Sequence, residues 1–109
     1  MGSMRQYYSA VVERNVVFEE IFHSEPYEVG WATELIIFVR SLDGAGDGAV
    51  EVEISPDGIR WCKEGTTFEL PTATDAVTFG KVSHFGNWVR LSGRTKKKFK
   101  ALITFSMKE

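Results

Sequence analysis

Hydrophobic and polar residues alternate with a period of two along most of the chain. Val50, Val52 and Ile54, for example, are separated by polar residues. This pattern is typical of a β-strand with one buried and one solvent-facing side. Residues 34–40, Glu-Leu-Ile-Ile-Phe-Val-Arg, are apolar at both parities. We therefore expect a central strand there, covered on each face.

The same pattern predicts further short strands, separated by turn-forming residues. We expect strands at 7–12, 16–22, 66–70, 76–82, 88–92 and 102–105, and turns at 14–15, 24–26, 43–48, 56–58, 86–87 and 93. The segment 11–21 comes nearest to a helix, but its β-branched residues and Asn15 favour two strands. About eight strands, spaced roughly 8–12 residues apart, predict an all-β domain, an antiparallel jelly-roll-like β-sandwich.

The stretch Glu51–Gly65 raises a question about its tryptophan. Pro56-Asp57-Gly58 predicts a tight turn, after which Ile59 and Trp61 share one face of the next strand. The favoured interpretation places Trp61 over the core at the edge of the sandwich. The alternative is an exposed ring that stacks on a sugar or a protein partner.

Composition narrows the class of protein. The chain has 109 residues with a net charge of −2, enough for one domain and poor in the positive charge typical of nucleic-acid binders. Its longest apolar run, 35–39, is too short for a membrane helix, and no signal peptide is visible. Met1-Gly2-Ser3 has the character of a cloning remnant, which leaves 4–109 as the domain. A single cysteine excludes an internal disulfide.

Two segments carry a resemblance to a known group of domains. "SEPYEVGWATELIIFVRSLDGAGDGAVEVEISPDGIRWCKEG", followed by "GKVSHFGNWVRLSG" and a closing strand, is similar to small jelly-roll domains of phage and bacterial proteins. Galactose-binding-like and discoidin-like modules share this rhythm of turn glycines, core aromatics and a strand arginine. The resemblance implies virion decoration or tail components, carbohydrate-binding modules or self-assembling surface proteins.

The candidates for catalysis or metal binding are few. Cys62 and His84 form a nucleophile pair only if their strands are neighbours, and His23 is the one other histidine. We therefore predict that the protein is not an enzyme. Asp43 and Asp47 lie in a glycine-rich loop and are weak calcium candidates, but two carboxylates are too few for tight binding. No cofactor is expected.

Aromatic residues near strand ends are the candidates for ligand binding. They are Trp31, Trp61, Trp88, Tyr27 and Phe85. Aromatic faces can stack on the apolar faces of sugar rings. The plainer interpretation, core or edge packing, is favoured for each tryptophan.

A basic run and the N-terminal strand are the candidates for assembly contacts. We expect Lys96, Lys97 and Lys98 in a basic hairpin, 94–100, opposite the acidic Glu13, Glu19, Glu20 and Glu25. Tyr7 and Tyr8 begin a strand with few protective charges. Complementary charge and an open edge predict a homo-oligomer.

The leading hypothesis is therefore a non-enzymatic β-sandwich protein that acts by homo-oligomerisation and partner binding, of virion-decoration or surface-assembly type. Its partner would be a capsid, a shell or a surface glycan, and its location the cytoplasm or a virion. The alternative is a carbohydrate-binding module that uses the aromatic residues at loop edges.

Overall fold

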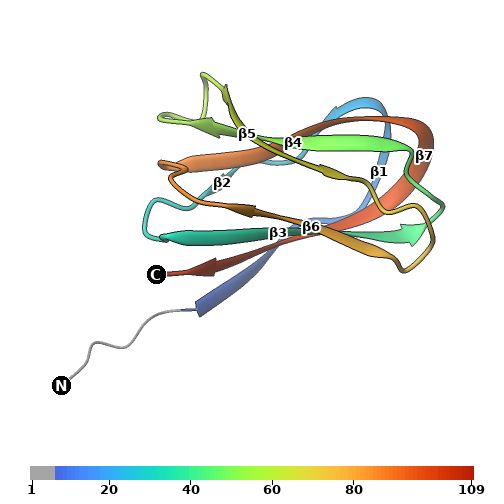
Figure 1. Cartoon of the computed structure of the whole chain (residues 1–109), viewed down its shortest axis with the longest axis horizontal. Coiled ribbons are helices and arrows are strands. Elements are labelled where there is room, and N and C mark those ends of the chain that lie inside the picture. Colours follow the sequence, from blue (N-terminus) through green and yellow to red (C-terminus); the bar gives the residue numbers. More distant parts are fainter. Residues whose placement is uncertain (1–6) are drawn as a thin grey trace.

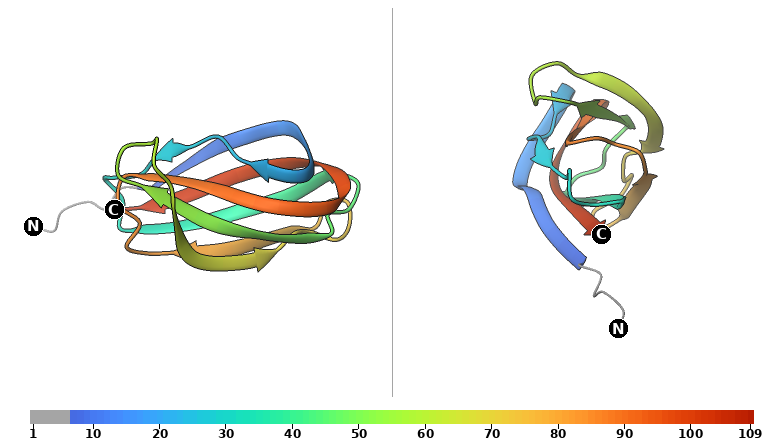
Figure 2. Two further views of the ribbon diagram at one scale, coloured as in Figure 1. Left: turned by 90° about the horizontal axis from the view of Figure 1, so that it is seen from above. Right: turned by 90° about the vertical axis from the view of Figure 1, so that its left-hand side faces the viewer.

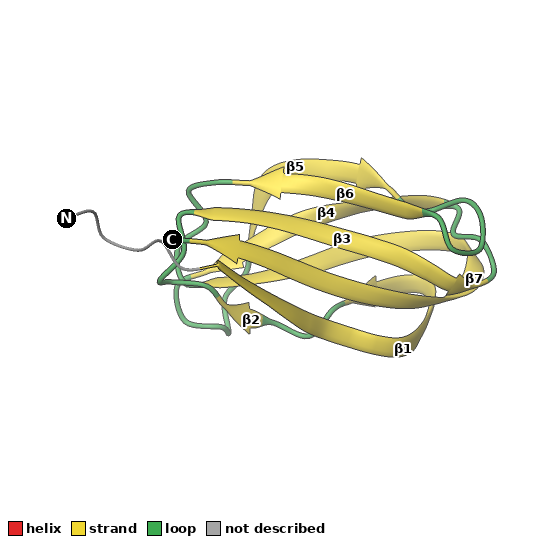
Figure 3. Ribbon diagram, turned by 90° about the horizontal axis from the view of Figure 1, so that it is seen from below, coloured by secondary structure: helices red, strands yellow, loops and turns green. Residues whose placement is uncertain are grey.

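The computed structural model describes residues 7–109, whose regular structure is entirely β-strand (Figure 3). The strands are β1 (Tyr7–His23), β2 (Tyr27–Glu28), β3 (Glu34–Asp43), β4 (Gly48–Ser55), β5 (Cys62–Glu69), β6 (Val77–Val82) and β7 (Trp88–Lys108). All their pairings are antiparallel. The prediction of an antiparallel all-β domain is confirmed, with seven strands in the described part rather than about eight. Over residues 7–109 no helix is present that could span a membrane.

Strand β7 organises the sheet, whose order is β5-β4-β7-β3-β6. Its first part, from Trp88 to Thr95, pairs with β4, and its second part, from Lys100 to Lys108, pairs with β3. Strand β1 follows β7 along both parts, and the short β2 pairs with the start of β7. Because β7 and β1 both bend, the sheet folds over on itself and encloses a core (Figures 1 and 2).

The expected turn at Arg14-Asn15 is wrong, because β1 continues through it as one strand. The pairing of β1 with β7 shifts register on both sides of this point and again before Glu20. Asn15 and Glu20 have φ angles of 56° and 53°, in the left-handed region. Such residues form bulges that bend a strand without reversing it. The asparagine that indicated a turn therefore provides the bend between the two parts of β1.

The expected turn at Gly93 is also wrong, because β7 runs through this residue. A Cβ atom here would lie 2.6 Å from the Phe22 ring and 2.7 Å from Val50 Cγ1. Gly93 is therefore needed for close packing within a strand, which is the second common use of a strand glycine.

The sheet nearly closes into a barrel where β5 approaches β6. The Thr66 hydroxyl lies 3.4 Å from the Lys81 carbonyl oxygen, to which it donates a hydrogen bond. Gly80 permits this approach, since a Cβ there would lie 2.5 Å from the Phe68 ring. The view along the barrel in Figure 2 shows these strands beside each other.

The core is filled by the inward-facing side chains of the folded sheet. From β7 these include the buried Val89, Leu91, Phe99, Ala101, Ile103, Phe105 and Met107. Phe18 and Phe22 of β1 stack on each other with ring centroids 4.1 Å apart, and Phe99 meets Phe18 edge-on. The alternating pattern of the sequence thus corresponds to alternating burial along β7.

Candidate functional site

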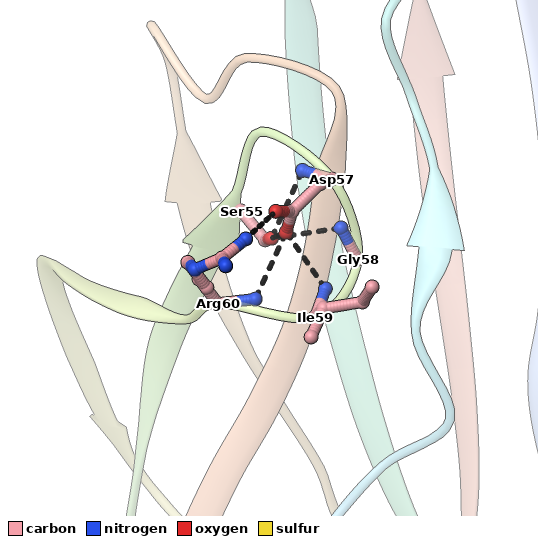
Figure 4. A network of polar contacts seen from close by, with 5 residues as sticks. All are labelled: Ser55, Asp57, Gly58, Ile59 and Arg60. Atoms are coloured by element: carbon pink, nitrogen blue, oxygen red, sulfur yellow. Dashed lines mark hydrogen bonds and ion pairs between the residues drawn. The ribbon is translucent and has the colours of Figure 1, made fainter.

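The turn between β4 and β5 is held by the side chains of Ser55 and Asp57 (Figure 4). Asp57 Oδ1 accepts hydrogen bonds from the backbone N–H groups of Ile59 and Arg60, each 2.9 Å long. The Arg60 guanidinium pairs with Oδ2 at 2.9 Å. The Ser55 hydroxyl donates to Asp57 Oδ1 and accepts from the Gly58 N–H. The predicted turn is confirmed, and its polar groups satisfy one another.

These contacts lower the pKa of Asp57 to about 2. The backbone hydrogen bond from Arg60 contributes most, followed by that from Ile59, because donors to a carboxylate stabilise its charged form. Asp57 is thus held ionised by its own turn.

We expect Asp57→Asn to lower the free energy of unfolding at neutral pH. The variant's free energy of unfolding should also depend less on pH in the acid range. The folded-state pKa of about 2 lies below the unfolded value, so the contribution of Asp57 is present above pH ~4 and is lost as the pH falls towards 2. The difference in melting temperature between the two proteins should therefore shrink between pH 5 and pH 2, as measured by thermal unfolding monitored by circular dichroism. A difference that stays constant over this range would contradict the role of the charge.

Trp61 lies at the surface end of this turn and not within the core. Strand β5 begins at Cys62, so Ile59 and Trp61 precede it, and Ile59 is 77% exposed. The expected shared strand face is therefore wrong, because the hydrogen bonds to Asp57 hold these residues in the turn. Trp61 is half-buried, and the Arg90 guanidinium lies 4.3 Å from its ring centroid. Arg90 in turn binds Glu53, with 2.6 Å between Nε and Oε1.

The five aromatic candidates for ligand binding all belong to segments at one end of the barrel, on the left in Figure 1. They are Tyr27, Trp31, Trp61, Phe85 and Trp88. Phe85 is buried, which fits the plainer interpretation of core packing. Trp88 is half-buried, and its ring lies 3.4 Å from the position that a Cβ on Gly58 would take. The tryptophans thus have separate neighbours, and among residues 7–109 no ring contact joins two of them.

Two of these aromatics meet the N-terminal strand. Tyr8 and Trp31 contact edge-to-face, with ring centroids 6.4 Å apart. The pKa of Tyr27 is raised, by burial first and by the nearby Tyr8 second. Tyr7 lies next to this cluster, with the Lys108 ammonium 5.4 Å from its ring centroid. Strand β1 thus pairs with its own β7 and leaves Tyr7 and Tyr8 exposed.

A small hollow lies beneath the same end of the barrel. It has a volume of about 210 Å³ and is lined by Ile54, Pro56, Cys62 and Phe85 among others. Cys62 is exposed, while His84 lies in the adjoining loop with a φ of 57°. Within residues 7–109, no hydrogen bond between Cys62 and His84 is present, and the expectation that the protein is not an enzyme stays a prediction.

The loop with the two calcium candidates lies at the opposite end of the barrel. The Asp47 N–H donates to the Thr95 hydroxyl at 3.1 Å, and its carbonyl accepts from the Lys96 N–H at 2.8 Å. Asp43 pairs in register with Lys100. In the described part of the chain no three metal-ligating side chains gather, at this loop or elsewhere. The expectation of no tight calcium binding stays a prediction.

The basic run is a continuous part of β7 and not a hairpin. Here β7 passes from its pairing with β4 to its pairing with β3, and Thr95 and Phe99 point into the core while Lys96, Lys97 and Lys98 are exposed. The expectation that the acidic residues lie opposite this run is wrong for Glu20, which is beside Thr95 on the neighbouring β1. Glu13 lies farther along, beside Ile103. The long pairing of β1 with β7 therefore brings one acidic residue next to the basic run within one chain.

A second group of acidic residues bridges the two parts of the folded sheet. Glu13 Oε2 accepts a hydrogen bond from the Glu25 backbone N–H at 2.8 Å. Burial raises the pKa of Glu13, and the charge of Glu25 adds to this rise. The Glu13 carboxylate is therefore engaged by the backbone of its own chain, whereas Glu25 is exposed.

The feature that sequence reasoning missed is an apolar outer face on β3 and β6. Only the inner face of β3 is covered by the core; Ile36 and Phe38 on its outer face are half-buried. The Phe38 ring lies beside Phe79 of β6, with centroids 6.0 Å apart, and Phe79 is 53% exposed. The expectation of a strand covered on both faces is therefore wrong for the described chain. The apolar run at 35–39 was the signal in the sequence that could have revealed this outer face.

The sequence matches no family model and no curated protein. The solved structures that share the fold include the following three. The SPBc2 prophage-derived protein YomS has a TM-score of 0.67 and 7% identity, covering 100% of this chain and 98% of that one. The PBSX exported protein XepA has a TM-score of 0.65 and 11% identity, and 92% of this chain matches 36% of it. A chain of infectious bursal disease virus, Gx strain, has a TM-score of 0.56 and 12% identity over 97% of this chain and 32% of that chain. The chain thus has the fold of a phage-derived protein and of parts of two larger proteins.

Proposed function

We propose that this chain is a non-enzymatic, jelly-roll-like structural module of a phage particle or similar shell, and that it acts by self-association and partner binding. The observation that carries the proposal is the exposure of large apolar side chains on a small domain. Tyr7, Val11, Val17 and Ile21 are 42–70% exposed along β1, and Val77 and Phe79 are 51% and 53% exposed on β6. Contiguous exposed apolar surface is typical of interaction sites.

The comparisons support the setting of this proposal. YomS, which comes from a prophage, matches the chain from end to end, and the viral chain shares the fold as a part of a larger protein. A fold alone does not define a function, so self-association must be measured directly.

Sedimentation equilibrium over about 10–500 μM protein tests the proposal, because the weak association expected of a small interface is detected in this concentration range. We expect an oligomer whose population rises with concentration. Added salt should weaken its ionic contacts, which are screened over about 8 Å at physiological ionic strength, while apolar contacts persist. A monomer at every concentration in low salt would overturn the proposal. A glycan array run on the same sample would then test the carbohydrate-binding alternative.

A further inference from the structure

The two outer faces of the folded sheet differ in chemistry. On the face formed by β5, β4 and the first part of β7, charged side chains pair within the chain. Glu53 binds Arg90 at 2.6 Å, and Glu51 binds Lys63 at 3.5 Å. Both ion pairs therefore lie within one chain.

The outer face of β6, β3, the second part of β7 and the first part of β1 is apolar at its centre. These strands lie side by side in Figure 3. The outward-facing apolar residues are Val11, Ile36, Phe38, Val77, Phe79 and Leu102, which we call the apolar face. Phe79, Phe38, Thr104 and Val11 lie in one row, because the register pairs each with the next across the four strands.

A shallow hollow lies beside the apolar face at one end of β3. It has a volume of about 340 Å³, and its lining includes Ile36 together with the charged Glu34, Lys81 and Lys108. The face therefore offers both projecting rings, at Phe38 and Phe79, and a depression beside them. A surface with both projections and a depression favours a partner that itself presents projecting side chains.

Charges on β3 indicate which partner fits. Glu34 and Arg40 are exposed on the outer side of the strand, one at each end of the apolar centre. At ~3.3 Å per residue they lie roughly 20 Å apart, too far to contact within one chain. A second copy placed on the face with its β3 antiparallel would bring Glu34 of one chain to Arg40 of the other, twice by symmetry.

We infer that the apolar face binds a second copy of this chain in this antiparallel, two-fold arrangement. The inference rests on the proposed function and names the surface that performs it. Sheets that pack face to face keep their strands within about 30° and lie ~10 Å apart. At ~10 Å from the two-fold axis the ends of the two β3 strands diverge by only about 5 Å at that angle, within reach of paired Glu and Arg side chains. Arg40 already contacts Asp75 at 2.8 Å, and this exposed pair leaves other guanidinium donors available.

The size of the face agrees with a weak, repeated contact. Four strands spaced ~4.8 Å apart, over roughly 23 Å of β3, give a footprint on the order of 450 Å². A standard interface buries about 800 Å² on each partner. One such contact therefore gives an association in the micromolar range or weaker, which suits a module that assembles through several contacts.

Charge exchange between the two positions tests the inference. We expect Glu34→Arg and Arg40→Glu, each alone, to weaken self-association at least tenfold in sedimentation equilibrium, because each places like charges together. The double variant should recover association. An equimolar mixture of the two single variants should also associate, because the mixed pair restores both contacts. Since these residues cannot meet within one chain, recovery by mixing requires contact between chains.

A matched pair of lysine substitutions tests the apolar centre. Phe79→Lys should weaken association at least tenfold, whereas Thr67→Lys, also exposed but on the opposite face, should leave it unchanged. If the wild-type protein associates and neither Phe79→Lys nor the charge variants change its affinity, the inference fails while the proposed function stands. A wild-type protein that stays monomeric overturns both. Circular dichroism confirms that each variant is folded.

Discussion

Phe105→Ala should destabilise the protein by about 3–5 kcal/mol. Phe105 is fully buried on the inner side of β7, between Ile37 of β3 and Ala10 of β1 in the register, and the Tyr27 ring meets it edge-on at 6.1 Å. Truncation removes the transfer free energy of the ring and leaves a cavity where the two parts of the sheet meet. Urea unfolding followed by tryptophan fluorescence measures the change.

Phe79→Ala is the matched control, because it removes the same side chain from an exposed position, 53% accessible on β6. We expect a loss below about 1 kcal/mol there. Equal losses at the two positions would mean that the apolar face contributes as much to folding as the core does. The surface would then have a structural role in the monomer, contrary to the proposed docking.

Gly48→Ala should cost about 2–4 kcal/mol, the sum of overpacking and backbone strain. Gly48 begins β4, with a φ of 155°, and a Cβ there would lie only 2.0 Å from the Arg94 carbonyl oxygen. Its own carbonyl accepts a hydrogen bond from the Leu70 N–H at 3.0 Å. Because backbone surrounds it on both sides, β4 must move away from β7 to admit a methyl group. Thermal unfolding should show a fall of roughly 10 °C or more.

Gly86→Ala separates the two causes of this effect. Gly86 has a φ of 66°, but no atom lies within 4 Å of the position of its Cβ. Only the backbone strain applies there, so we expect a loss of about 1 kcal/mol. If Gly86→Ala proves as costly as Gly48→Ala, the approach of the Arg94 carbonyl is not the reason for the glycine at position 48.

The turn at 56–58 shows how far local sequence rules reach. Pro56-Asp57-Gly58 predicts the turn correctly, because proline presets its φ angle and glycine permits a positive φ, here 78° at Gly58, in any fold. Ile59 and Trp61 do not belong to the strand after it, which begins at Cys62, because the Asp57 carboxylate binds the N–H groups of Ile59 and Arg60. A side chain that accepts hydrogen bonds from the backbone competes with strand pairing, and its reach depends on geometry.

The predicted number of strands was wrong for a different reason. Asn15 and Gly93 are turn residues by composition, yet one forms a bulge and the other fits beneath Phe22 within a strand. Bulge, turn and close approach use the same residue types, so the distinction depends on which strand lies alongside. The basic run was interpreted as a hairpin on the same grounds, although β7 passes straight through it.

The prediction of candidate sites from the sequence was limited by the same lack of information on contacts between distant residues. Trp31 and Tyr27 come together with Tyr8 because β1 lies beside this end of the barrel, which no local pattern records. The apolar face was visible as a run at 35–39, but a run apolar at both parities predicts two covered faces in any strand. That one face is left to a partner follows only from what packs against β3.

By itself, then, the sequence determined the class of fold and inward-facing residues such as Val50 and Val52, because burial of alternate side chains is a local property of a strand. The tertiary structure alone decided that β1 and β7 each serve both parts of the sheet, that Glu20 of β1 lies beside Thr95 at the basic run, and that the outer face of β3 is open. Those features depend on contacts between residues distant in the chain, which form when the whole sheet closes around its core.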